Sequence, residues 1–345
     1  MSLENIDESM RKVALRLALE DEEKRKSNPN ETHERSLIII GSKSVGKTTM
    51  VYRFLEKDET PKPTIAMDYS FGRKAGKSLV KDVVHVWEIG HLTSSLVSAA
   101  MLGSALTHSP HHVTLMIMLD LSTPQSLWST LDESLTVARS AMKMSYDSRI
   151  VEEMKNARVR ERKKETETEV DPFPMRLCIL GGKYDKFKEF DMERKQLVDR
   201  TLRAVAHCLG ASLQYHSSRD TVLIRRTKDL LAQYGFGTQP NKGVCLDYEK
   251  PLVVPAGADS FSSINFKLPH GRPAAIIDTI KQFYVGSIPQ DIKTEESNLE
   301  DPANDPNFQE PIIDRLRSQR EEEISILLQD MLEGHTPKIA IPEPL

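Results

Sequence analysis

The sequence predicts an α/β protein built on a doubly wound, mostly parallel, six-stranded sheet with a phosphate-binding loop. Apolar runs of strand length alternate with segments whose apolar residues recur at helical spacing. This alternation is typical of a parallel sheet with helices on both faces. A glycine-bounded loop follows the first strand and precedes a helix. The predicted strands are residues 36–40, 69–74, 83–89, 114–120, 175–180 and 211–216, and the predicted helices are residues 47–55, 127–144, 193–209 and 221–234.

Composition limits the classes of protein to consider. The 345 residues carry a net charge of −4, which is too small to attract nucleic acid or an acidic membrane surface. Cys178, Cys208 and Cys245 are too widely spaced for a zinc site or a disulfide framework, so a reducing compartment is expected. The acidic N-terminus does not resemble a signal peptide, and the longest apolar runs, residues 37–40 and 114–119, are too short to span a bilayer. We therefore expect a soluble cytoplasmic protein without membrane insertion or nucleic-acid binding.

Two segments depart from the alternating pattern in the first half of the chain. Residues 1–30 contain apolar side chains at helical spacing between Leu3 and Leu17, which predicts an amphipathic helix followed by a polar linker. Residues 150–171 are densely charged with both signs. We interpret them as a solvated surface insertion rather than as a basic binding patch.

The pattern also weakens after the last predicted helix. Residues 241–290 are interpreted as an extension with one or two short strands near residues 251–255. Residues 291–345 combine an acidic linker, an amphipathic helix over residues 312–331 and a tail. The chain therefore divides into one nucleotide-binding type of domain with extensions at both ends.

One loop matches the phosphate-binding pattern GxxxxGK[ST] at every position, from Gly41 to Thr48. Glycines let backbone N–H groups wrap around phosphates, and the following helix adds a partial positive charge at its N-terminus. Lys47 is expected to reach the β- and γ-phosphates, and the Thr48 hydroxyl to ligate Mg²⁺. Because the required strand and helix flank the loop, a nucleotide site is favoured over a chance glycine loop. The candidate phosphate-binding residues are Gly41, Ser44, Gly46, Lys47, Thr48 and Thr49.

The segments expected to sense the γ-phosphate are less regular. Thr64, in Pro-Thr-Ile, resembles a switch threonine that closes over Mg²⁺, with an ordinary loop as the alternative. The third strand ends in Val-Trp-Glu-Ile-Gly90, where a GTPase has Asp-x-x-Gly. Trp87 stands at the aspartate position, and an indole accepts no hydrogen bond from a metal-bound water. Glu88 is one position away and is expected to face the other side of the sheet. The hydrolytic half of the site is therefore predicted to be damaged.

The base-recognition half is predicted to be better preserved. Gly182-Lys-Tyr-Asp185 follows the fifth strand and resembles the guanine-reading Asn/Thr-Lys-x-Asp. Asp185 is expected to accept hydrogen bonds from guanine, the stem of Lys183 to cover the ring, and Gly182 to lack the side chain that ties this loop to the phosphate loop. Ser217 and Ser218 follow the sixth strand and resemble a loop that supports the base. The order of these motifs favours guanine over adenine and indicates a Ras-like G-domain over residues 31–240.

Taken together, these features resemble the dynein light intermediate chain family. The features are the N-terminal extension, the altered Asp-x-x-Gly, the charged insertion and the segment Val-Val-Pro-Ala-Gly-Ala-Asp-Ser-Phe at residues 253–261, which resembles the family's Pro-Ala-Gly-x-Asp. The resemblance covers about residues 30–290. The short chain is more similar to the dynein 2 branch than to the dynein 1 branch, whose members continue into a long tail.

The resemblance implies a non-catalytic subunit that binds and stabilises the tail of the dynein 2 heavy chain. It further implies contact with other dynein 2 subunits and with intraflagellar transport trains, and a location in the cytoplasm, the cytoskeleton and the cilium, at the axoneme and basal body. The expected cofactor is GDP or GTP with Mg²⁺, held as a structural ligand, and an empty site is the other possibility.

Two other functions remain open from the sequence. The first is an active regulatory Ras-like GTPase that cycles between states, which requires measurable turnover. The second is a P-loop kinase or ATPase, which leaves the loops at residues 182–185 and 217–219 without a role. We rank the kinase or ATPase last for that reason.

Overall fold

The computed structural model describes most of the chain in two compact units, residues 1–292 and residues 293–345, which are considered separately. The predicted helix over residues 3–17 lies outside the described residues, apart from Arg16, which is helical. The described residues are Arg16, 33–75, 81–105, 108–161, 170–239, 243–265, 273–291, Pro306 and 309–334.

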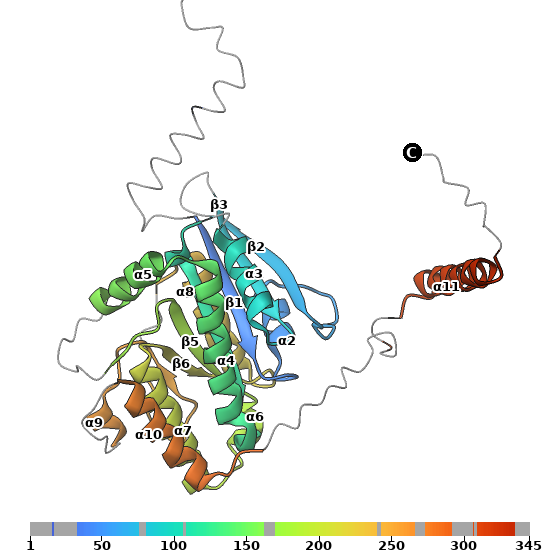
Figure 1. Ribbon diagram of the computed structural model, residues 1–345. Coiled ribbons are helices and arrows are strands. Elements are labelled where there is room, and N and C mark those ends of the chain that lie inside the picture. The colour runs from blue at the N-terminus through green and yellow to red at the C-terminus, as the bar shows by residue number, and fades with distance from the viewer. Residues whose placement is uncertain are drawn as a thin grey trace, which may run out of the picture. The chain divides into compact units, whose positions relative to one another are not determined.

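A seven-stranded sheet in the order β2-β3-β1-β4-β5-β6-β7 forms the centre of the first unit (Figure 1). Strands β1, β3, β4, β5 and β6 are parallel, whereas the edge strands β2 and β7 run antiparallel to their neighbours. The predicted doubly wound, mostly parallel α/β fold is confirmed, and the predicted count of six strands rises to seven. The strands are β1 (Glu34–Gly41), β2 (Met67–Ala75), β3 (Lys81–Ile89), β4 (Val113–Asp120), β5 (Arg176–Gly182), β6 (Ser212–Tyr215) and β7 (Val253–Val254).

Helices cover both faces of this sheet, so the strands are apolar along nearly their whole length. On β1, Leu37 and Ile39 join the core that lies under α2 and α8. Ile38 and Ile40 join the larger core under α3, α4 and α7. The helices of the first unit are α2 (Lys47–Phe54), α3 (Ser94–Ala105), η1 (Pro110–His112), α4 (Pro124–Ser145), α5 (Ser148–Glu161), α6 (Tyr184–Phe187), α7 (Met192–Cys208), α8 (Thr221–Phe236), α9 (Phe261–Ile264) and α10 (Pro273–Ser287).

The first part of the charged segment at residues 150–171, which was predicted to be a solvated surface insertion, forms most of helix α5. Its residues are exposed or half-buried except for Met154. Met154 on this helix is 1% exposed and belongs to the larger core, and the Arg158 side chain is only 12% exposed. The charge-rich composition concealed this single buried apolar position. Residues 162–169 lie outside the described part of the chain.

The extension after α8 is fastened to the domain by a buried ion pair. Arg203 on α7 donates from Nε to Asp259 Oδ2 at 2.7 Å and from Nη2 to Oδ1 at 2.9 Å. Both side chains are at most 3% exposed, and the Tyr248 hydroxyl accepts a further bond from Arg203 at 3.0 Å. Because Asp259 lies in the segment 253–261, this segment holds the extension against α7.

Helix α10, which the sequence analysis did not predict, completes the core on the same side. Its Ile276, Ile280 and Tyr284 are fully buried. The Tyr284 hydroxyl donates to the carbonyl of Pro124 at 2.9 Å, which ties α10 to the start of α4. The extension is therefore an integral layer of the first unit.

The second unit contains helix α11 (Pro311–Leu332), which agrees with the helix predicted over residues 312–331. Pro311 begins the helix, and Gly334 beyond its end has φ of +81°, a left-handed conformation that glycine favours. No residue of α11 is buried. Across the described ranges, no helix combines the length and the apolar character needed to cross a bilayer.

Candidate functional site

The phosphate loop joins β1 to α2 and adopts a conformation that requires its glycines. Gly41 has φ of +127° and Gly46 has φ of +105°. A Cβ atom at Gly41 would lie 2.0 Å from the carbonyl oxygen of Met118, so no other residue fits at this position. Ser44 also has positive φ, at +53°. These turns let the loop curl back above the sheet, as the sequence predicted.

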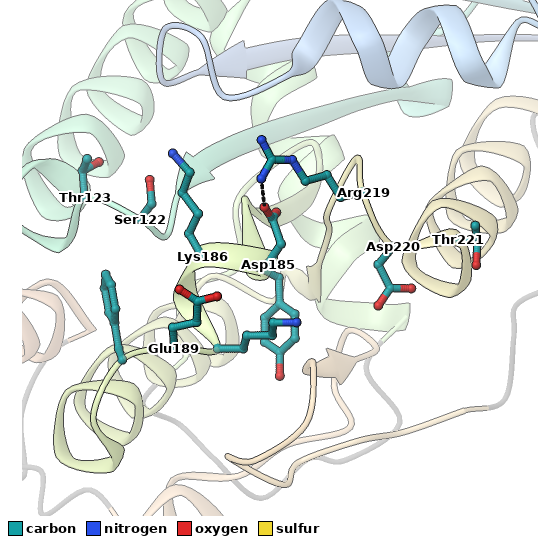
Figure 2. A pocket seen from close by; sticks show the side chains of 11 residues that line it. Ser122, Thr123, Asp185, Lys186, Glu189, Arg219, Asp220 and Thr221 are labelled. Atoms are coloured by element: carbon teal, nitrogen blue, oxygen red, sulfur yellow. Dashed lines mark ion pairs between the residues drawn. The ribbon is translucent and has the colours of Figure 1, made fainter.

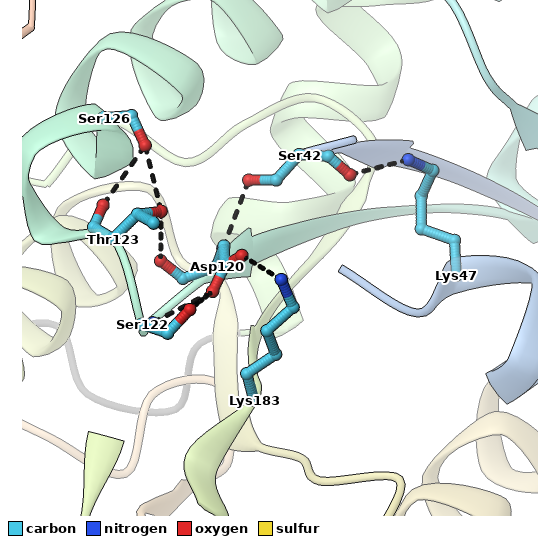
Figure 3. Close-up of polar contacts among 7 residues, drawn as sticks. All are labelled: Ser42, Lys47, Asp120, Ser122, Thr123, Ser126 and Lys183. Atoms are coloured by element: carbon cyan, nitrogen blue, oxygen red, sulfur yellow. Dashed lines mark hydrogen bonds and ion pairs between the residues drawn. The ribbon is translucent and has the colours of Figure 1, made fainter. Parts of the chain in front are cut away.

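Lys47 begins helix α2 and folds over the loop. It is 6% exposed, and its Nζ donates to the carbonyl oxygens of Gly41 at 3.3 Å and Ser42 at 2.8 Å (Figure 3). Burial lowers the pKa of Lys47, and the charge of Glu88 partly offsets this. The ammonium group therefore lies inside the loop, where a phosphate anion would compete with the two carbonyls for it.

The side chain of Glu88 lies beside the phosphate loop. This corrects the sequence analysis, which expected Glu88 to face the other side of the sheet. Glu88 is 3% exposed and accepts a hydrogen bond from the Thr48 hydroxyl at 2.7 Å. It pairs across the sheet with Ile39, whose side chain faces α2, so Glu88 faces α2 as well. Trp87 points to the other face, against Gly103 of α3. Strand alternation does separate the two side chains, but the assignment of faces was wrong.

The predicted switch threonine also reaches Glu88. Burial raises the pKa of Glu88, and hydrogen bonds from Thr48 and Thr64, together with the charge of Lys47, act against that rise. Gly90 allows this approach, because a Cβ atom there would lie 1.9 Å from the carbonyl oxygen of Thr64. The structure thus brings Thr48, Thr64 and Gly90 together at one end of β3. Thr49 follows in α2 and is half-buried.

The oxygen atoms at this position fit a small divalent cation. One carboxylate oxygen of Glu88, Oε2, is buried and has no hydrogen-bond partner among the described residues. The Thr48 hydroxyl lies beside the same carboxylate. Mg²⁺ prefers oxygen ligands of these two types, and it commonly retains several waters when a nucleotide completes its shell. An unpartnered buried carboxylate oxygen is costly without such a ligand.

Asp120, at the end of β4, connects the two halves of the site (Figure 3). Its Oδ2 pairs with the Lys183 ammonium at 2.6 Å, and its Oδ1 accepts from the Ser122 hydroxyl at 2.6 Å. Its backbone N–H donates to the Ser42 hydroxyl in the phosphate loop at 3.1 Å. Lys183 has φ of +57°, a left-handed backbone conformation. Lys183 is therefore anchored by a carboxylate that the sequence analysis did not single out.

Asp185 contacts two residues of the loop after β6, and Figure 2 shows one of these contacts, the ion pair with Arg219. Its Oδ1 accepts from the Ser217 hydroxyl at 2.7 Å, and its Oδ2 pairs with Arg219 at 3.4 Å. The carbonyl of Ser218 accepts a bond from Arg53 of α2 at 2.5 Å. The predicted base-recognition residues are thus brought together, with Arg219 held over the carboxylate expected to read guanine.

The glycine that replaces asparagine at position 182 has a packing partner. A Cβ atom at Gly182 would lie 2.6 Å from Cγ2 of Val45 and 3.1 Å from the Met118 methyl group. Val45 is 5% exposed and lies in the phosphate loop. An apolar contact therefore connects the two loops where the sequence analysis expected a lost polar connection.

A cavity of about 1270 Å³ opens beside the base-recognition loops (Figure 2). Both acidic and basic side chains line it, and none of the phosphate-loop residues 41–48 does. Lys186 and Glu189 reach it from the Lys183 side, and Asp220 and Thr221 from the start of α8. Because Asp185 and Arg219 also line it, the cavity includes part of the candidate base site, and it is distinct from the phosphate loop.

Comparison with known proteins identifies the family. No profile of a known protein family matches the chain. The chain is 34% identical over 327 residues to cytoplasmic dynein 2 light intermediate chain 1 of Danio rerio, covering 88% of each chain. It is 35% identical over 314 residues to the Homo sapiens protein of the same name, covering 85% of this chain and 87% of that protein. The chain belongs to the cytoplasmic dynein 2 light intermediate chain family.

The fold agrees with that of this family. A crystal structure of the conserved domain of a dynein light intermediate chain superposes with a TM-score of 0.54 at 17% identity. It covers 72% of this chain and 97% of that domain. Membership in the dynein 2 light intermediate chain family, which the sequence resembled through separate motifs, is thus confirmed.

Within this family member, sequence reasoning missed three residues that organise the site. Ser42 and Asp120 link the phosphate loop to the base-recognition loop, and Glu88 reaches Thr48. Asp120 was detectable, because an acidic residue directly after an apolar parallel strand lies at the edge of the sheet where ligands bind.

Proposed function

We propose that this chain is a non-catalytic light intermediate chain subunit of the dynein 2 motor. In this role it binds and stabilises the tail of the dynein 2 heavy chain for retrograde intraflagellar transport and cilium assembly. The observation that carries the proposal is its identity of 34–35% with cytoplasmic dynein 2 light intermediate chains over 85–89% of its length. Other dynein 2 subunits and intraflagellar transport trains are its proposed partners, and the cytoplasm, ciliary axoneme and basal body its proposed locations.

The P-loop site is proposed to hold GDP or GTP with Mg²⁺ as a structural ligand. The loop from Gly41 to Thr48 would hold the phosphates, with Lys47 neutralising their charge. Thr48 and Glu88 would hold the cation, with Thr64 and Gly90 closing one side. Lys183, Asp185, Ser217 and Ser218 would contact the base. A ligand that binds only the folded state raises stability by RT ln(1 + [L]/Kd), about 2.7 kcal/mol at a hundredfold excess over Kd.

Affinity purification of the tagged full chain from ciliated cells, with mass spectrometry of the bound proteins, tests the subunit role. We expect the dynein 2 heavy chain in a ratio near one to one. Recovery of other regulators without any heavy chain would contradict the proposal. A nucleotide assay of the purified chain then becomes the next test.

Replacing Lys47 with Ala separates nucleotide binding from assembly. We expect GDP affinity to fall by about 100-fold, because a buried charge-assisted contact to phosphate is lost. We also expect heavy-chain recovery to remain largely intact wherever the variant folds normally by circular dichroism. The matched control is Lys43→Ala, which removes an exposed lysine from the same loop. A variant that folds normally and yet abolishes motor function would show that the nucleotide is more than a structural ligand.

One observation favours a second function, an active GTPase switch. The carboxylate of Glu88 beside Thr48 restores an acidic group where the motif pattern predicted none. Single-turnover GTP hydrolysis, measured with and without candidate partners, distinguishes the two functions. Turnover that is accelerated by a partner and lost in Glu88→Ala would favour the switch, and turnover that is slow under all conditions would favour the structural ligand.

A further inference from the structure

Strand β2 (Met67–Ala75) leaves one edge of the sheet free. It is the terminal strand of the sheet and pairs with β3 over all nine of its residues (Figure 1). Among the described residues, no backbone hydrogen bond joins its other side to any segment. A free edge of this length is a template for pairing with another strand.

One face of this strand carries exposed aromatic side chains suited to a partner, and the other carries the exposed Lys74 and the half-buried Asp68. Tyr69 and Phe71 are 44% and 51% exposed, and their rings are stacked with centroids 6.4 Å apart. The guanidinium of Arg73 lies 5.2 Å from the Phe71 ring centroid on the same face. Asp68 and Lys74 lie on the opposite face. Asp68 accepts a bond from the Ser70 hydroxyl at 3.4 Å, and the Lys74 ammonium lies 5.9 Å from the Phe236 ring centroid, while among the described residues no ion pair involves either of them.

Symmetry limits how this edge can pair with a second copy of itself. A two-fold axis perpendicular to the sheet keeps each side chain on its own face, so directly opposite residues must belong to the same face. The numbers of two opposite residues therefore add up to an even total. Only the register centred on Phe71 uses all nine residues of the strand.

That register places complementary side chains opposite each other. Phe71 faces Phe71 of the second copy, and Tyr69 faces Arg73, which suits an aromatic ring and a guanidinium. Asp68 faces Lys74, and the symmetry repeats this ion pair on the other side of the axis. Like charges are opposite each other at no position of the strand.

We propose that β2 pairs antiparallel with β2 of a second copy of this chain, centred on Phe71, so that the two sheets continue across a two-fold axis. Lysine and arginine on an edge strand ordinarily discourage pairing with other chains. Here the sequence order Asp68, Phe71, Lys74 makes a second copy the exception, because Lys74 faces Asp68 and Arg73 faces Tyr69, so no two cations face each other. This inference does not depend on the proposed function or on nucleotide binding.

Charge reversal tests the pairing directly. The full chain is examined by sedimentation velocity over a concentration series of about 1–100 μM, the range of weak to moderate association. We expect a monomer–dimer equilibrium for the wild type. Asp68→Lys and Lys74→Asp should each weaken the dimer at least tenfold, because each places two pairs of like charges opposite one another. The exposed α4 substitution Lys143→Asp is the matched control and should have no effect.

A mixture of the two variants gives the sharpest result. Asp68→Lys chains and Lys74→Asp chains restore both ion pairs only with each other, so their equimolar mixture should form heterodimers near the wild-type affinity. A Phe71→Cys chain should also form an intermolecular disulfide under mild oxidation, because position 71 faces itself, whereas Asp68→Cys should not. A wild type that stays monomeric at the highest concentration would overturn the proposal. So would a dimer that none of these substitutions affects.

Discussion

The two halves of the nucleotide site differ in how their polar groups are satisfied. In the phosphate half, Lys47 donates to two loop carbonyls, and one carboxylate oxygen of Glu88 is buried without a partner in the described residues. In the base half, Lys183 is paired with Asp120, and Asp185 with Ser217 and Arg219. One half presents charges toward a ligand, whereas the other has its charges paired within the protein.

This difference indicates where binding free energy arises. Groups that are already paired must exchange one partner for another, so their net gain on binding is small. A carboxylate with one buried, unpartnered oxygen gains much more from a cation. We therefore expect phosphate and Mg²⁺ to dominate affinity in this protein, with a weaker dependence on the base than the motif order at residues 182–185 implies.

The largest effect is expected at Glu88. Glu88→Ala should lower Mg²⁺-dependent GDP affinity by about 100-fold, roughly 2.7 kcal/mol, because it removes the buried carboxylate beside Thr48. Titration calorimetry with and without Mg²⁺ measures this. Glu152→Ala, which removes an exposed carboxyl group from α5, is the control. Equal losses with and without Mg²⁺ would show that Glu88 does not act through the cation.

The same carboxylate predicts a pH dependence with a definite sign. Burial raises the pKa of Glu88, and only the ionised form binds Mg²⁺. Mg²⁺-dependent affinity should therefore be full at high pH and be lost as the pH falls through this raised pKa. The loss should begin at a higher pH than for an exposed carboxyl group. Glu88→Gln should abolish this pH dependence.

A smaller effect is expected where the two halves meet. Gly182→Asn should destabilise the protein by about 2 kcal/mol in thermal or urea unfolding, because the new side chain overlaps Val45. Combining it with Val45→Ala should recover part of this loss and tighten guanine binding. If the single substitution is neutral, the contact between these loops is looser than its distance suggests.

The smallest effect is expected at Arg219, whose side chain is 75% exposed. Arg219→Ala frees one oxygen of Asp185 and should change GDP affinity by less than about fivefold, since exposed ion pairs contribute up to about 1 kcal/mol. The ratio of GDP to ADP affinity is the quantity to compare. A change above tenfold would mean that the base half contributes as much as the phosphate half.

The sequence predicted the strands, five of the ten described α-helices (α2, α4, α7, α8 and α11) and the phosphate loop because these depend on local patterns. Lys47 and Thr48 could be assigned from spacing alone. Glu88 could not, because the face it occupies depends on the register between β1 and β3, which no local pattern contains. The contact of Gly182 with Val45 is likewise non-local.

Some misses were avoidable. In α10, Ile276, Ile280 and Tyr284 stand at helical spacing, but the prolines and glycines around them are typical of loops. In α5, one buried methionine among many charges was too weak a signal.

The ion pair between Arg203 and Asp259, together with α10, also constrains how this protein is made. Arg203 is synthesised more than fifty residues before its only buried carboxylate partner among the described residues. Until the ribosome has released the chain to about residue 288, α7 lacks both that counter-charge and the covering of Ile276, Ile280 and Tyr284. The domain is therefore expected to complete its folding late in translation, and a nascent chain stopped near residue 240 should be a substrate for chaperones rather than a folded domain.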